Sequence, residues 1–123
     1  MLANPTVRVV NNWLHDVGTG LWAACLLVIW LLEREIDVLA PVPEASIDAL
    51  TILSDVQRLM FWLLVAALVD IAVTGALRLA YWRQQTPADE MPAKRPALIG
   101  KHVVFLVVYG GGTLWAWTLI QAA

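Results

Sequence analysis

The sequence predicts an all-α protein, an integral membrane three-helix bundle with a short amphipathic interfacial helix in its first loop. The 123 residues are 60% hydrophobic and only 15% charged, whereas soluble domains are roughly 45–50% apolar. The chain also contains three apolar stretches of about 20 residues or more, and at ~1.5 Å per helical residue each could cross a ~30 Å hydrocarbon core. Helices are expected because backbone groups in lipid must bond one another. We therefore treat residues 1–123 as a single membrane domain.

The first span covers about residues 13–32, WLHDVGTGLWAACLLVIWLL. We do not interpret it as a signal peptide, because it lacks a multi-lysine start, its apolar run is too long and no small-residue cleavage site follows. Cys25 is the only cysteine, so an internal disulfide cannot form. We interpret it as a small packing residue.

The first connection, residues 33–58, is acidic and turns at Pro41 and Pro43. Residues 45–55 then place apolar side chains at helical spacing, namely Ile47, Leu50, Ile52 and Leu53. This pattern predicts a short amphipathic helix on the membrane surface, either separate from the second span or continuous with it.

The second span covers about residues 59–82 and the third covers about residues 98–120. Between them, residues 83–97 read RQQTPADEMPAKRPA. This segment has three prolines and no apolar periodicity, which predicts an exposed loop.

The distribution of cationic residues predicts the direction of the chain in the membrane. Only Arg34 and Arg58 flank the acidic connection, and the other six lie towards the N-terminus and the second connection: Arg8, Arg78, Arg83, Lys94, Arg95 and Lys101. The positive-inside rule then places the N-terminus in the cytoplasm and the C-terminus outside, in a bacterial cytoplasmic (inner) membrane. The net charge of −2 does not suggest a nucleic-acid partner, which would favour a basic face.

The chain has only two histidines, His15 and His102, each about one turn inside the start of a span. The first and third spans run in the same direction, so the two imidazoles are expected at similar depth. Imidazole is a common axial ligand of haem iron, and helical bundles build such sites from facing helices. The pair therefore predicts a b-type haem with His15 and His102 as the metal ligands.

The residues around this pair fit a flat, apolar cofactor. Gly18, Tyr109 and Gly112 are the predicted contacts, while Lys101, Arg78 and Arg83 are predicted to neutralise the propionates. Two alternatives stay open. The histidines could be structural residues in the interfacial zone, or they could bind another metal, although the three methionines are scattered and two histidines alone make a poor copper or zinc site.

Two further features lie within the spans. Asp70 is near the middle of the second span, where ionisable residues are rare and usually face the bundle interior or a water cavity. It is a candidate proton-linked or quinone-contacting carboxyl. The alternatives are a neutral acid hydrogen-bonded to another helix and a partner to a charge on a neighbouring subunit. The glycine triplet at residues 110–112 predicts a close approach of a neighbour, with the second span, a haem and another subunit all left open.

Three stretches, LHDVGTGLW, VQRLMFW…VTGALRLAYW and LIGKHVVFL, resemble the CopD-like and HemJ-like helical membrane domains. The resemblance covers about residues 12–117. It implies a helical bundle, often haem-binding, linked to copper uptake or to haem-pathway redox chemistry. This chain has three predicted spans where those families have four or more, so a haem would need a partner or a second copy to enclose it.

The leading hypothesis is a small membrane-embedded b-type cytochrome subunit that passes electrons between a quinone pool and partner redox subunits. The rival is a cofactor-free scaffold subunit of a larger respiratory or photosynthetic complex, in which the histidines share no task. Copper handling, by analogy with CopD, is a third idea that the lack of methionine or cysteine pairs disfavours. The sequence shows no nucleophile–base pair or phosphate loop, so we do not expect catalysis by this chain alone.

Overall fold

The three predicted spans are three long helices. The computed structural model describes residues 4–44, 47–85, 88 and 91–122, which form α1 (Pro5–Leu39), α2 (Ile47–Gln85) and α3 (Met91–Ala122) without any strand in those ranges. Each helix is long and apolar enough to cross a membrane. The predicted all-α three-helix architecture is confirmed, and it indicates a multi-pass membrane protein.

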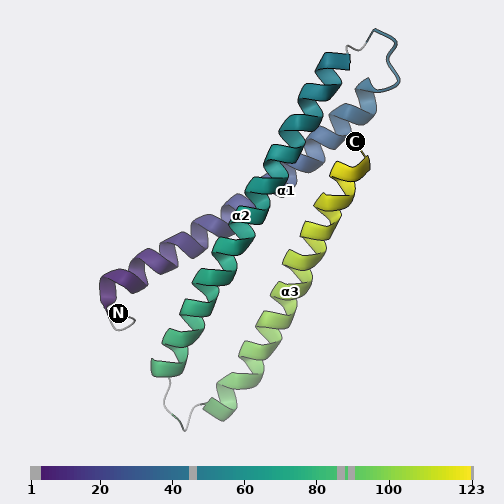
Figure 1. The fold of residues 1–123 in the computed structure, drawn as a ribbon. Helices are drawn as coiled ribbons and strands as arrows, with labels where there is room; N and C mark the ends of the chain where they lie inside the picture. The colour runs from purple at the N-terminus through teal and green to yellow at the C-terminus, as the bar shows by residue number, and fades with distance from the viewer. Residues whose placement is uncertain (1–3, 45–46, 86–87, 89–90, 123) are drawn as a thin grey trace.

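Successive helices run in opposite directions (Figure 1). The N-terminus and the connection between α2 and α3 lie towards one end, and the C-terminus and the connection between α1 and α2 lie towards the other (Figure 1). The contact between α1 and α2 is the most extensive of the three interfaces. In the most apolar window of α3 only 11% of the residues are buried, so most of its surface remains for lipid or another protein.

Helix α1 is longer than the predicted span at both ends. The Asn4 side chain accepts a hydrogen bond of 2.9 Å from the backbone N–H of Thr6, and Pro5 occupies the first helical position, where its missing N–H costs nothing. The helix ends at Leu39. Ala40 still has helical backbone angles and its N–H donates to the Ile36 carbonyl at 2.8 Å, but Pro41 has no N–H with which to continue the helical hydrogen bonds.

The predicted amphipathic segment is helical, but it is not a separate helix. Its described residues form the first turns of α2, which continues without a break to Gln85; Ala45 and Ser46 lie outside the described residues. The continuous alternative is therefore the correct one. Ile47 and Ile52 are exposed on this helix.

The prediction of an exposed loop over residues 83–97 was wrong at both of its ends. Helix α2 extends to Gln85 and α3 begins at Met91. Pro92 is compatible with this start, because a proline in the first turn removes an N–H that has no helical partner. Pro96 lies inside the helix and removes one backbone hydrogen bond near the helix end. The segment contains few apolar residues, so apolar periodicity could not predict its helical ends.

The interior face of α1 follows one seam, whose residues are spaced alternately by four and three positions. This spacing keeps side chains on one side of a helix. The seam begins with Asn11, His15 and Gly18 and continues with the apolar residues Trp22, Cys25 and Ile29. The core is completed by Phe61, Leu64, Ala67 and Ile71 from α2 and by Ala116 and Ile120 from α3. The seam is therefore polar towards the N-terminal end and apolar beyond it.

Trp22 is the main link between α1 and α3. Its indole N–H donates a hydrogen bond of 3.2 Å to the Thr113 hydroxyl, and its ring meets that of Tyr109 edge-on with centroids 4.8 Å apart. A Cβ placed on Gly112 would lie 2.6 Å from the Trp22 Cη2 atom. Gly112 thus provides the close approach that the glycine triplet predicted, whereas a Cβ on Gly110 or Gly111 would meet no described atom within 4 Å.

Candidate functional site

An apolar groove lies between α2 and α3 at the end of the bundle that holds the N-terminus, and both histidines line it. Its volume is about 600 Å³, which is within the range of small-molecule and cofactor sites. It is lined by His15 from α1, by Leu68, Ile71, Ala72, Gly75, Ala76, Arg78, Leu79 and Trp82 from α2, and by Leu98, Lys101, His102, Phe105, Leu106 and Tyr109 from α3.

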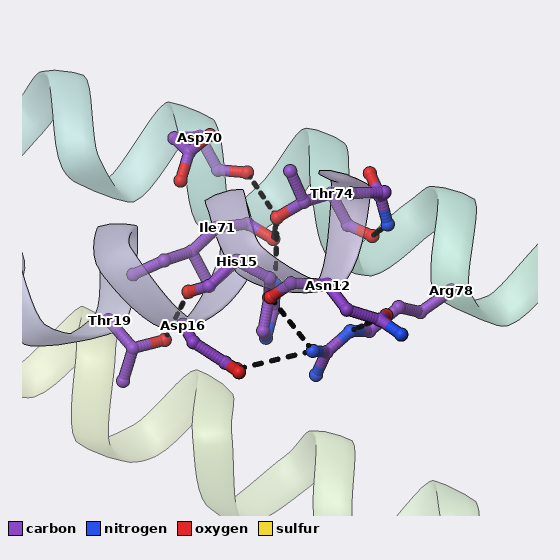
Figure 2. Close-up of polar contacts among 9 residues, drawn as sticks. Asn12, His15, Asp16, Thr19, Asp70, Ile71, Thr74 and Arg78 are labelled. Atoms are coloured by element: carbon purple, nitrogen blue, oxygen red, sulfur yellow. Dashed lines mark hydrogen bonds and ion pairs between the residues drawn. The ribbon is translucent and has the colours of Figure 1, made fainter. Parts of the chain in front are cut away.

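His15 is held against α2 by a hydrogen bond of 2.7 Å between its Nδ1 atom and the Thr74 hydroxyl (Figure 2). The same hydroxyl donates its only proton to the backbone carbonyl of Asp70, at 2.6 Å. It must therefore accept from His15, so Nδ1 of this imidazole carries a proton. In the neutral ring the lone pair is then on Nε2.

His102 reaches the same protonation state through its own helix. Its Nδ1 atom lies 2.7 Å from the backbone carbonyl oxygen of Leu98. A carbonyl oxygen can only accept, so Nδ1 must again donate. Its Nε2 atom therefore carries the lone pair when the imidazole is neutral.

The two histidines thus share the arrangement of a metal-ligating imidazole. Such a ring usually donates its second N–H to a carbonyl, carboxylate or other acceptor, which fixes the tautomer and the ring orientation. Within the described part of the chain, neither Nε2 atom has a hydrogen-bond partner. Both remain available to a ligand in the groove.

Arg78 lines the groove and is fastened to α1 (Figure 2). Its Nε donates to the Asn12 side-chain oxygen at 2.9 Å and its Nη2 donates to the Asn12 carbonyl oxygen at 3.2 Å. The Nη2 atom also lies 3.2 Å from the Asp16 carboxylate. Asp16 is 74% exposed, so this pair is of the weak, solvent-screened kind. The main effect of these contacts is to fix the position of the Arg78 guanidinium.

The other two predicted propionate contacts differ from each other. Lys101 lines the groove, and its ammonium lies 5.4 Å from the centroid of the Phe105 ring on the same helix. Arg83 does not line the groove; it lies in an adjoining pocket that His102 also reaches. Arg78 and Lys101 therefore line the groove, and Arg83 lies in the pocket beside it.

The remaining predicted site residues are divided between the groove and the helix interfaces. Tyr109 lines the groove. Gly18 is buried where α1 meets α2, against the side chain of Asp70, and a Cβ on it would overlap with Asp70 Oδ2. Gly112 packs against Trp22. Neither glycine borders the groove, so both serve the approach of helices here.

The sequence did not predict a role at this site for Thr74 or Asn12. Thr74 is one turn after Asp70 in an otherwise apolar helix, a position where a threonine often bonds its own backbone. That pattern does not reveal the bond to His15, which depends on the crossing of α1 and α2. Gly75 also lies here, and a Cβ on it would be 3.5 Å from the His15 Cε1 atom.

No group of three or more His, Cys, Asp or Glu side chains that could hold a metal ion is present in the described residues. A haem differs from such a site because the porphyrin supplies the equatorial ligands and the protein supplies only the axial ones. No protein-family model matches the chain, and no curated protein or solved structure matches it either.

Proposed function

We propose that this chain is a small b-type cytochrome subunit of a membrane oxidoreductase, with His15 and His102 as the axial ligands of one haem. The observation that carries the proposal is that both imidazoles line one apolar groove with Nδ1 engaged as a donor and Nε2 left for a ligand. The resemblance to CopD-like and HemJ-like domains favours the same assignment.

The residues of the chain have separate tasks in this proposal. Thr74 and the Leu98 carbonyl orient the two imidazoles, and the apolar walls of the groove exclude water. Arg78 and Lys101 would hold the propionates, with Arg83 in the adjoining pocket. A bound haem would supply one-electron transfer, with a potential set by its ligands and their hydrogen bonds.

We further propose that the electrons pass between a quinone pool and partner redox subunits in a bacterial cytoplasmic membrane, with the N-terminus in the cytoplasm. The extensive exposed surface of α3 supports a partner or a second copy on that side of the groove. Asp70 is proposed as a proton-linked group because of its position next to Thr74. Its backbone carbonyl accepts the hydrogen bond from the Thr74 hydroxyl.

The deciding experiment is a reduced-minus-oxidised visible spectrum of the full chain, purified in mild detergent with its natural complex. We expect a sharp α band of b-type haem that is lost or altered in both His15→Ala and His102→Ala. Leu14→Ala and Val104→Ala are matched controls, because both residues are exposed neighbours of the histidines on the same helices and do not line the groove. Both controls should retain the band.

Two outcomes contradict the proposal. The intact complex could lack haem, which would favour the cofactor-free scaffold. Alternatively, haem could be present but unaffected by both histidine substitutions, which would place the cofactor on another subunit. Adding imidazole to His102→Gly provides a further check, because restoration of the band requires an axial position left open by the missing side chain.

A further inference from the structure

A separate pocket lies at the same end of the bundle, between the first turns of α1 and the last turns of α2. Its volume is about 440 Å³, and Arg8, Asn12, Arg78, Tyr81 and Trp82 contribute to its lining. We infer that this pocket, called the arginine pocket below, binds the phosphate group of an anionic phospholipid.

One residue of the arginine pocket, Tyr81, has a buried hydroxyl that no described residue bonds. Tyr81 is only 6% exposed, and its hydroxyl has no hydrogen-bond partner within the described ranges. A buried polar group without a partner is unfavourable, so such groups usually mark the place of a water or ligand. The Nε atom of Arg8 is buried and unpartnered in the same way. Two side chains of one pocket, Arg8 and Tyr81, therefore each carry a buried donor that no described residue bonds.

The arginine pocket is also positively charged. Both cationic residues of the arginine pocket are arginines, and none of its described lining residues is acidic. Arg78 has a partial counter-charge in the exposed Asp16, whereas Arg8 forms no ion pair with a described residue. The guanidinium group matches phosphate oxygens with paired hydrogen bonds. The pocket thus has the donors and the charge that a phosphate requires.

The position of the pocket favours a lipid over a dissolved phosphate. It lies where two apolar helices approach the end of the bundle, and Trp82 forms part of its wall. Tryptophan and tyrosine are enriched at the level of the lipid headgroups, and basic pockets between membrane helices commonly hold anionic headgroups.

The inference does not depend on haem. Arg8 and Tyr81 line the arginine pocket but not the groove, and only Arg78 and Trp82 line both. Arg8 and Tyr81 are therefore the positions to change, because their substitution leaves the lining of the haem groove intact.

The experiment uses the full chain in a neutral detergent, titrated with short-chain phosphatidylglycerol, short-chain phosphatidylcholine or inorganic phosphate, with binding followed by native mass spectrometry. We expect phosphatidylglycerol to bind at least about fivefold more tightly than phosphatidylcholine. Arg8→Gln should weaken phosphatidylglycerol binding about fivefold, the contribution of one cation near an anionic lipid. Arg8→Lys should restore part of it. Arg95→Gln, the same change at an exposed position outside the pocket, should have little effect.

Tyr81→Phe provides a readout that general loss of folding cannot imitate. Removing an unsatisfied buried hydroxyl should leave the lipid-free protein as stable as before or more so, while phosphatidylglycerol binding weakens about threefold. Any haem band should be unchanged in this variant.

Three results would overturn the inference. The first is equal binding of the two lipids. The second is an equal loss in Arg8→Gln and Arg95→Gln, which would show diffuse surface charge instead of a pocket. The third is inorganic phosphate binding as tightly as the lipid with the same dependence on Arg8, which would identify a soluble phosphate as the ligand.

Discussion

The Nδ1 atom of His15 and the hydroxyl of Thr74 lie 2.7 Å apart and join α1 to α2. The backbone carbonyl of Thr74 also accepts a hydrogen bond of 3.0 Å from the side chain of Asn11, one turn before His15. Two polar residues from the seam of α1 therefore meet at one residue of α2. Thr74 fixes both the crossing of these helices and the ring that faces the groove.

Replacing Thr74 with valine keeps the shape of the side chain and removes the acceptor. We expect Thr74→Val to lower the free energy of unfolding by about 1–3 kcal/mol, because the His15 N–H is left without a partner. The measurement is titration with a denaturing detergent in mixed micelles, followed by far-UV circular dichroism. If haem is bound, its affinity should also fall about 10–100-fold through the lost orientation of His15.

Thr51→Val is the matched control for that change. Thr51 is exposed, and among the described residues its hydroxyl bonds the Ile47 carbonyl of its own helix alone. Its substitution should alter stability by less than about 0.5 kcal/mol. Equal effects of the two substitutions would show that the bond between Thr74 and His15 does not stabilise the helix crossing.

The contact between Gly18 and Asp70 predicts an energetic coupling between these two positions. A methyl group at Gly18 would occupy the place of the Asp70 carboxylate, so Gly18→Ala should destabilise the protein by about 1–3 kcal/mol. The penalty should shrink in the Asp70→Ala background, giving a coupling energy of about 1 kcal/mol in a double-mutant cycle. Gly20→Ala is the control, because no described atom lies within 4 Å of its Cβ position. Additive effects of Gly18→Ala and Asp70→Ala would contradict this contact.

The sequence was sufficient for the fold because long apolar stretches have one solution in lipid. It also predicted a similar depth for His15 and His102 by counting along the helices, and both residues line one groove in the structure. The partners of these histidines could not be obtained in the same way. The bond from His15 to Thr74 depends on the angle and register at which α1 crosses α2, which apolar periodicity does not specify.

The neighbours of the glycines could not be predicted from the sequence either. Gly18 and Gly112 were predicted to border a cofactor, because a small residue makes room for any close neighbour. In the structure the neighbours are Asp70 and Trp22. A glycine in the sequence indicates a close approach without identifying what approaches.

At the other end of the bundle, the stability of the protein is expected to depend on Gln57. This side chain is fully buried and donates to the Ile29 carbonyl at 3.2 Å and to the Glu33 carboxylate at 2.8 Å. Gln57→Glu replaces the amide donor with a second carboxyl group, and we expect a loss of about 1–3 kcal/mol, because the Ile29 carbonyl loses its donor and two carboxyl groups meet at a buried site. The same titration measures it.

Two variants test this explanation of Gln57. Gln121→Glu makes the same chemical change at an exposed position and should be nearly neutral. The double variant Gln57→Glu/Glu33→Gln exchanges the two groups and should recover part of the lost stability, because one amide again faces one carboxylate. A double variant less stable than Gln57→Glu alone would refute the pairing.

The last prediction separates two adjacent glycines of α3. Gly112→Ala should cost about 1–3 kcal/mol through overpacking, because its Cβ would be 2.6 Å from a rigid ring atom of Trp22. Gly111→Ala should be neutral or stabilising by up to about 1 kcal/mol, since its Cβ position is open and alanine favours helix. In the Trp22→Phe background, which lacks the crowding ring atoms, Gly112→Ala should cost less. If both glycine substitutions are equally costly, the surface beyond Gly111 is itself packed against another protein, and the isolated bundle does not account for the triplet.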